Sequence, residues 1–557
     1  MPEPILESLA VGPLPLINHF LRRLRLDELL EDAVQDRDRR RKLPIPRALG
    51  VFVRNLLLSR YPLYEIPQWT KGYVPELLGL APAEMRLLND DRIGRCLDRL
   101  FAVDRAQLLT ALVVGMTREF DMDLKILHND STTITFTGQY PHRGGGEASP
   151  LHITYGHNKD HRPDLKQLLF DLTVTEDGSV PVWVGLHDGN VTDDQTHLDT
   201  WTALRQIVGR PDFVYVADSK LCVTETLTSI TGQGGHFVTV LPRTRKEERW
   251  FKEHVQTHTL PWEEVWRRPP ARRQEDPAEV YQAVESPLRS AEGFRILWYH
   301  SSVKHSHDQH VRQSRIERAV AELEFLRNRL GTRKWKQPRV VEDAAVKILE
   351  TLGAERWIEV RVEPGEEVQF RQAGPGRPGK TTAYRRVSHP KPKLHWTIRE
   401  DTVAYDAKID GLFPLLTDLD KATPKQVLLW YKHQPRLEKR FEQLKTVLGV
   451  RPVYLKKVER VEAYLLLYFV ALVVAALIER DLRRAMKQQH VPMLPLYPEK
   501  RDCQAPTAER VLELFANLRR HRLLQEGKEV HRFRDELSRT QRQVLRLLGV
   551  PTDSFLT

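Results

Sequence analysis

The chain has 557 residues, with 86 lysines and arginines against 75 aspartates and glutamates, and a formal net charge of +11. This length predicts on the order of three or four domains of ~150 residues each, and the basic balance fits either a polyanionic partner or simple solubility. The three cysteines form no CxxC pair, which argues against a zinc or disulfide framework and favours a reducing cytoplasm. No signal peptide is visible at the N-terminus, MPEPILESLA.

Residues 1–120 are predicted to form a helical region that binds DNA ends. Apolar residues recur at helical spacing from Ile17 to Leu30. Asn89 or Asp90 offers an N-cap for an amphipathic helix that extends to Phe101. Small helical units of this kind either bind DNA or simply pack together, and no recognition-helix pattern decides between the two.

Residues 121–243 are predicted to form strands and helices in a recognisable order. The predicted elements are a strand with Asp130, strands at 168–175 and 180–186, a helix at 197–209, a strand at 213–218, a helix at 224–230 and a strand at 236–242. A turn at Asp177-Gly178 makes the second and third strands a hairpin. This order describes a ribonuclease H-like sheet, in which the carboxyl end of the fourth strand lies beside the first strand. Asp218 ends that fourth strand, so it can converge with Asp130.

A third acidic residue, Glu438, lies on a charged helical segment at 435–445. Two strand-borne aspartates and a helix-borne glutamate can hold two Mg²⁺ ions ~3.5–4 Å apart for in-line phosphoryl transfer. Mg²⁺ prefers oxygen ligands and keeps several waters, so a few carboxylates suffice. The pattern predicts that Asp130, Asp218 and Glu438 are catalytic metal ligands in an enzyme that cuts and joins nucleic acid. Asp193 lies in a predicted turn, from which it can help to position Asp130.

Residues 244–400 are predicted to form an insertion domain of mixed structure that interrupts the catalytic core. A basic stretch rich in glycine and proline, 371–386, is predicted to be neither helix nor strand. Arg377 and Lys380 in this stretch are predicted to contact DNA, with a solvated loop as the alternative. Trp298 is a candidate to cradle a flipped base, although a core tryptophan is the commoner case.

The chain returns to the catalytic core at 401–485 and ends in a region, 486–557, that is predicted to be helical. Residues 463–478 are sixteen uninterrupted apolar residues. A membrane-spanning helix needs ~20, so this run predicts a core helix that is buried all round, and no membrane partner. The predicted fold is therefore α/β: a ribonuclease H-like core with a large mixed insertion and helical terminal regions.

Several segments together resemble one family. They are HNDSTTITF (128–136), GHNKDHRPDLKQ (156–167), HDGNVTDDQT (187–196), VADSK (216–220), HFVTVLPRT (236–244) and DGLFPLLTD (410–418). Their order is similar to that of the DDE transposases of bacterial insertion sequences, in the insertion-sequence-four superfamily. Residues 12–30 also resemble the N-terminal module of one branch.

The resemblance extends to that family's Tyr-x2-Arg-x3-Glu-x6-Lys signature. Tyr431, Glu438 and Lys445 match at the right spacing, whereas Gln434 stands in place of the arginine, with Arg436 two residues on. The resemblance implies that Lys445 holds a phosphate and that Tyr431 contacts or stacks near the terminal nucleotide. Either Arg436 takes over the phosphate contact of the missing arginine, or Gln434 makes a neutral one.

The resemblance also implies a reaction. A homodimer would bind the terminal inverted repeats of double-stranded DNA in a synaptic complex, cleave the ends and join them to target DNA by a cut-and-paste route. The implied cofactor is Mg²⁺, for which Mn²⁺ can substitute, and the implied location is the bacterial cytoplasm, at the nucleoid. The alternatives are a ribonuclease H-like hydrolytic nuclease and a catalytically inactive, transposase-derived DNA-binding protein.

Overall fold

The computed structural model describes residues 4–35, 42–141, 151–269, 277–332, 334–449, 455–497, 499, 501–526 and 528–555. The fold is mixed α/β, and the chain divides into two compact units. Unit 1 comprises Met1–Thr239, Thr417–Lys421 and Gln426–Thr557, and unit 2 comprises Val240–Leu416 and Ala422–Lys425.

The N-terminal part of unit 1 is mostly helical. Its helices are α1 (Leu14–Arg23), α2 (Leu26–Val34), α3 (Ile45–Leu58), α4 (Ile66–Thr70), α5 (Asp90–Phe101) and α6 (Arg105–Glu119). The side chain of Asn89 accepts a hydrogen bond from the backbone N–H of Arg92 (2.9 Å), which confirms the predicted N-cap of α5. A strand, β1 (Ile5–Ala10), precedes these helices.

A mixed sheet follows in unit 1. Its strands are β2 (Ile126–Phe136), β3 (Lys166–Thr175), β4 (Pro181–His187), β5 (Val214–Val216) and β6 (His236–Val240), in the spatial order β4-β3-β2-β5-β6. β2 pairs antiparallel with β3 and parallel with β5, and β5 pairs parallel with β6. Helices α7 (His197–Val208) and α8 (Thr224–Gly232) connect the later strands. The predicted hairpin and helices are confirmed, but the strand predicted at 213–218 ends at Val216.

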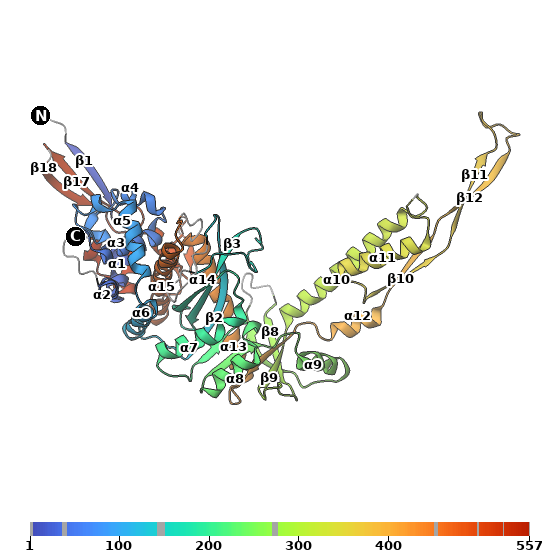
Figure 1. The fold of residues 1–557 in the computed structure, drawn as a ribbon, viewed down its shortest axis with the longest axis horizontal. Helices are drawn as coiled ribbons and strands as arrows, with labels where there is room; N and C mark the ends of the chain where they lie inside the picture. Colours follow the sequence, from blue (N-terminus) through green and yellow to red (C-terminus); the bar gives the residue numbers. More distant parts are fainter. Residues whose placement is uncertain are drawn as a thin grey trace. The chain divides into compact units, whose positions relative to one another are not determined.

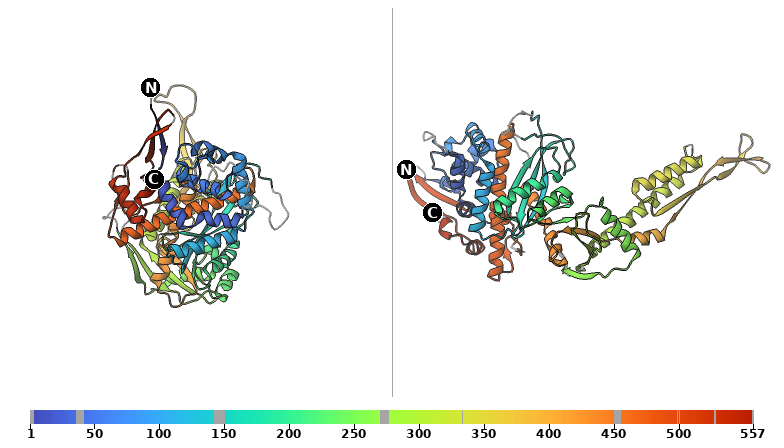
Figure 2. Two further views of the ribbon diagram at one scale, coloured as in Figure 1. Left: turned by 90° about the vertical axis from the view of Figure 1, so that its left-hand side faces the viewer. Right: turned by 60° about the horizontal axis from the view of Figure 1, so that its bottom comes forward.

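One long helix, α15 (Val458–Gln488), forms the centre of unit 1. It lies between the N-terminal helices and the sheet (Figures 1 and 2). Among the described residues, it is the one helix long and apolar enough by itself to cross a membrane, and its most apolar window is wholly buried in the protein. The core helix predicted from the apolar run at 463–478 is therefore confirmed.

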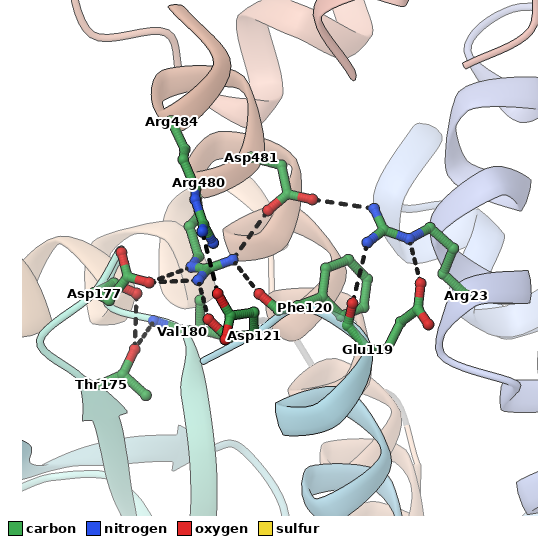
Figure 3. A network of polar contacts seen from close by, with 10 residues as sticks. All are labelled: Arg23, Glu119, Phe120, Asp121, Thr175, Asp177, Val180, Arg480, Asp481 and Arg484. Atoms are coloured by element: carbon green, nitrogen blue, oxygen red, sulfur yellow. Dashed lines mark hydrogen bonds and ion pairs between the residues drawn. The ribbon is translucent and has the colours of Figure 1, made fainter. Parts of the chain in front are cut away.

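The side chain of Arg480, which is only 2% exposed, anchors α15 to its neighbours (Figure 3). Its guanidinium donates hydrogen bonds to the carbonyl oxygens of Phe120 and Asp121, both at 3.0 Å, and pairs with Asp177 at 2.7 Å. A Cβ at Gly178, whose φ is +81°, would lie 2.7 Å from the Arg480 side chain. The Asp177-Gly178 turn therefore needs glycine both for its backbone conformation and for the passage of this arginine.

Unit 2 combines a small sheet with a long helical pair. The strands β7 (Glu263–Arg268), β8 (Glu279–Glu285), β9 (Arg295–Ser301) and β14 (Leu412–Thr417) lie in the order β14-β9-β8-β7. The remaining elements are α9 (Lys246–Thr257), α10 (Ser302–Asn328), α11 (Pro338–Leu352), β10 (Ile358–Glu363), β13 (Lys393–Ile398) and α12 (Glu400–Ala407). Ile316 and Leu323 of α10 pack with Val341 of α11 and Leu394 of β13 in one buried cluster.

The basic stretch at 371–386 is partly a hairpin, so the prediction that it contains no strand is wrong at both ends. Strands β11 (Glu366–Gln372) and β12 (Tyr384–Pro390) pair antiparallel, with Arg371 opposite Arg385. Glycine and proline are confined to the connecting residues 373–383, where they form the turn instead of interrupting the strands.

The helical prediction for the C-terminal region is also wrong in part. Helices α16 (Ala508–Glu513) and α17 (Arg539–Leu548) are present, but β15 (Leu494–Pro495), β16 (Asp502–Cys503), β17 (Arg519–Gln525) and β18 (Lys528–Arg534) are strands. β17 lies between β1 and β18 in a three-stranded antiparallel sheet. The two ends of the chain therefore meet in one sheet, which no local pattern predicts.

Candidate catalytic site

Asp130 and Asp218 lie on neighbouring parallel strands of unit 1. The β2–β5 pairing sets Leu127 opposite Tyr215 and His128 opposite Val216. The pairing ends there, and each aspartate lies two residues beyond this last pair; the charge of Asp218 acts on Asp130. Asp218 lies just past the end of β5, where its side chain accepts a hydrogen bond from the backbone N–H of Lys220 (2.9 Å) and caps a short 3₁₀ helix.

The two aspartates share a local excess of negative charge. The pKa of Asp130 is raised to about 7: burial is the largest cause and the charges of Asp218 and Asp193 add to it, while Lys159 and the Ser131 backbone N–H lower it. The pKa of Asp218 is also raised, by burial first and by Asp193 among the charges. Carboxylates in this situation are stabilised by a cation.

Lys159 supplies one cation to this cluster. Its Nζ donates to Asp193 Oδ2 (2.7 Å) and to the Oγ and carbonyl O of Ser131 (2.7 and 2.8 Å), and it lies 3.8 Å from Asp130 Oδ1. Ser131 Oγ donates in turn to Asp193 Oδ1 (2.7 Å). The prediction that Asp193 helps to position Asp130 agrees with this chain of contacts. Lys159 itself was not among the predicted site residues, although it lies in the family-like segment 156–167.

Glu438 lies on helix α14 (Gln434–Glu442), and its side chain is exposed. Helix α13 (Pro424–Tyr431) ends just before it. Burial raises the pKa of Tyr431, and so do the charges of Asp218 and Glu438. The negative charges of Asp218 and Glu438 therefore both act on Tyr431. This shared effect links the glutamate on the helix to the aspartate after the strand.

Gln434 connects the helix to the strand that carries Asp130. Its Nε2 donates a hydrogen bond to the backbone carbonyl of Asn129 (3.0 Å). At the position where the family has arginine, this chain thus makes a neutral contact with β2. Arg436 is exposed on the same helix.

Lys445 lies in a π-helical turn, Gln443–Val447, that continues α14. Its Nζ lies 2.8 Å from Asp160 Oδ1. A phosphate at Lys445 would have to compete with this ion pair or bind beside it, so its predicted role stays a prediction.

The predicted DNA contacts of unit 2 lie in two different environments. Arg377 and Lys380 are exposed in the turn between β11 and β12, and the sequence between Glu367 and Glu400 contains no acidic residue. Trp298 is 0% exposed in β9, and its ring stacks on Phe251 with a centroid distance of 4.2 Å. The interpretation of Trp298 as a base cradle is therefore wrong for this structure, because core packing covers the ring.

The donor set can be compared with what Mg²⁺ requires. The oxygen donors of Asp130 and Asp218 fit a hard cation, because burial and neighbouring carboxylates raise the pKa of both and a bound cation would favour their charged forms. Within the described residues, however, no group of three or more His, Cys, Asp or Glu side chains is arranged to hold a metal. Further ligands would have to come from water, DNA or a movement of Glu438.

Two protein-family models match this chain. Residues 6–114 match a family model described as "Domain of unknown function (DUF4277)", and residues 122–474 match the model "Transposase DDE domain". No curated protein matches the chain. A cryo-EM structure of a piggyBac transposase synaptic complex with hairpin DNA is similar at 10% identity and a TM-score of 0.28, over 51% of this chain and 60% of that one. The transposase model matches more than half of the residues of this chain. The chain therefore belongs to the DDE transposase domain family.

Proposed function

We propose that this transposase moves a bacterial insertion sequence of the insertion-sequence-four superfamily by a cut-and-paste route. It would act as a homodimer at the nucleoid, binding the terminal inverted repeats of double-stranded DNA and joining the cut ends to target DNA. The strand order β4-β3-β2-β5-β6 supports a ribonuclease H-like core. The ordered family-like segments support the superfamily.

One observation carries the proposal: the buried carboxylate of Asp130, on β2, has a raised pKa to which the charge of Asp218, just past the neighbouring parallel strand β5, contributes. We assign Asp130, Asp218 and Glu438 as the residues that would hold Mg²⁺, or Mn²⁺ in its place. The bound ions would supply charge stabilisation for phosphoryl transfer and favour deprotonation of the attacking hydroxyl.

The other residues of the site would organise the ligands and the DNA. Lys159 fixes Asp193 and Ser131 beside Asp130, and Gln434 holds α14 against β2. Tyr431 would contact the terminal nucleotide, while Arg436 and Lys445 would contact phosphates.

Arg377 and Lys380 would add phosphate contacts from the β11–β12 turn. The absence of acidic residues from 368 to 399 supports this role, because nearby carboxylates would otherwise repel the DNA backbone. These contacts would position the DNA without identifying its sequence.

A strand-transfer assay tests the proposal. The purified chain would be incubated with Mg²⁺, labelled duplexes that carry the flanking inverted repeats, and a target plasmid. We expect ends that are first released and then joined to the target. Release without any hairpin or joined product would identify a hydrolytic nuclease, and specific binding without cleavage would identify an inactive DNA-binding protein.

A further inference from the structure

The sheet formed by the two ends of the chain has a charged surface that the catalytic site does not use. Strands β1, β17 and β18 extend beyond the helices of unit 1 (Figures 1 and 2). Every described residue of β18 is exposed. An edge strand this open is expected either to be protected by charge or to contact a partner.

Four arginines lie on one face of this sheet. Arg520 of β17 is directly opposite Arg534 of β18, and Arg522 is directly opposite Arg532. Residues two apart on a strand point to the same side, so Arg520, Arg522, Arg532 and Arg534 form a single surface, which we call the arginine face. Both pairs precede the register shift at Leu523/Leu524, so the bulge does not separate them.

The positive charges of the arginine face repel one another. Burial lowers the pKa of Arg520; Glu76 opposes this effect, and the charges of Arg532, Arg522 and Arg534 add to it. Like charges directly opposite on neighbouring strands destabilise a sheet. Two such pairs are therefore a cost to folding, which a polyanionic partner would relieve.

Acidic residues also lie beside this face. Glu7 lies 3.1 Å from Arg522, and Glu529 lies 2.8 Å from Arg532 and 3.9 Å from Arg522. Glu76 contributes an electrostatic effect at Arg520. The ion pairs are largely solvent-exposed, and pairs of this kind contribute little and exchange readily for other anions.

The opposite face of the same sheet is different in chemistry. There the ring of Phe533 stacks against His521 (centroid distance 4.9 Å) and His531 (5.8 Å). Ser8 Oγ lies 2.8 Å from His521 Nδ1. Of the five arginines in β17 and β18, four lie on the arginine face and only Arg519 lies on this opposite side.

We propose that the arginine face binds the phosphate backbone of a DNA duplex, independently of sequence and outside the residues assigned to catalysis. The proposal rests on the proposed function, because it takes DNA as the partner of the whole chain. Alternate residues on a strand lie ~6.5–7 Å apart and neighbouring strands ~4.8 Å apart, so the guanidiniums form a compact block that can contact several phosphates. Arginine suits this contact because its planar fork bonds phosphate oxygens bidentately.

The test compares two double variants of the full chain in binding to a short labelled duplex of arbitrary sequence, without Mg²⁺. Arg532→Gln with Arg534→Gln removes two charges from the arginine face. Arg539→Gln with Arg542→Gln removes two charges from exposed positions of the neighbouring helix α17, and serves as the control with the same net charge.

We expect the first double variant to bind more weakly at moderate salt. The slope of log affinity against log salt concentration should become less negative by about 1.8, at roughly 0.9 for each lost phosphate contact. The control should keep the wild-type slope, and Arg532→Lys with Arg534→Lys should keep most of it. Matching thermal melts would show that the variants fold.

Two results would overturn the proposal that the arginine face binds DNA. One is equal binding by the wild type and the Arg532/Arg534 glutamine variant, and the other is an equal loss in the control. A wild-type chain that binds no duplex would contradict the proposed function itself, so the two failures are distinguishable.

Discussion

Lys159 is the residue on which the charge balance of the catalytic site depends. Its ammonium group contacts Asp193 and Ser131 and lies within 3.8 Å of Asp130. A bound divalent cation would neutralise the same carboxylates, so lysine and metal should substitute for each other in stabilising the fold. This substitution of metal for lysine can be measured as a change in stability, without any activity assay.

We predict that Lys159→Met lowers the free energy of unfolding by roughly 1–3 kcal/mol without metal, because charged hydrogen bonds are lost. Added Mg²⁺ should raise the melting temperature of this variant more than that of the wild type. Lys125→Met, which removes a 70% exposed lysine 3.7 Å from Asp123, is the control and should change little. Equal Mg²⁺ shifts in Lys159→Met and wild type would contradict the prediction.

Asp171 is a second buried carboxylate, on β3. It is 0% exposed and accepts hydrogen bonds from Thr200 Oγ1 and Asn129 Nδ2, both at 2.5 Å. Burial raises its pKa to about 6 in spite of these hydrogen bonds. A raised pKa means that the folded chain holds this proton more tightly than the unfolded chain does.

The pH dependence of stability follows from that difference. Between pH ~4, near the unfolded pKa, and pH ~6, the folded state binds more protons, so Asp171 makes stability fall as pH rises through this window. Asp171→Asn does not titrate. The wild type should therefore lose up to about 3 kcal/mol relative to Asp171→Asn between pH 4 and 7, measured by chemical denaturation. Parallel curves for the two proteins would contradict this account.

At the scale of elements, a buried ion pair connects α14, the helix that carries Glu438, to α15. Arg440 of α14 and Glu479 of α15 are 2.8 Å apart, and their side chains are 6% and 7% exposed. Arg440 also donates to the carbonyl oxygens of Ser179 and Gly178, both at 2.9 Å. Together with the Gln434 contact to β2, Arg440 therefore helps to set the position of α14 and of Glu438 on it.

We predict that Arg440→Met destabilises the chain by roughly 3–5 kcal/mol, because it leaves Glu479 buried without its main partner. Combining it with Glu479→Gln should recover part of the loss, since it removes a buried charge whose remaining ion-pair partner is Arg483 at 3.6 Å, while an acceptor remains for the Ala508 N–H. Denaturation curves of the single and double variants measure both effects. A double variant no more stable than the single one would show that charge is not the cause.

The elements that could be predicted from the sequence are those with a local signal. The apolar run at 463–478 predicts α15, and the Asp177-Gly178 turn predicts the β3–β4 hairpin. The terminal sheet has no such signal. Ser8 and His521, which are hydrogen-bonded in it, are 513 residues apart, and the arginines of β17 and β18 conceal the alternation expected of strands.

At the scale of the whole molecule, the candidate site was predictable where strand order alone brings residues together. Asp130 and Asp218 follow from two parallel neighbours. Lys159 could not be predicted as their partner, because it reaches them from a loop whose course is set by tertiary contacts. The insertion domain at 244–400 stays a prediction, and the β11–β12 hairpin within this stretch was concealed by its glycine and proline residues.

The proposed function requires that Asp130, Asp218 and Glu438 act together in metal-dependent DNA cleavage. The most direct measurement is cleavage of labelled duplexes that carry the flanking inverted repeats, with and without Mg²⁺, by wild type, Asp218→Asn and Asp212→Asn. Asp212 is an exposed aspartate just before the same strand, so its substitution matches the change in charge. We predict Mg²⁺-dependent cleavage that falls at least ~10³-fold in Asp218→Asn and persists in Asp212→Asn. Cleavage retained by Asp218→Asn would contradict the account.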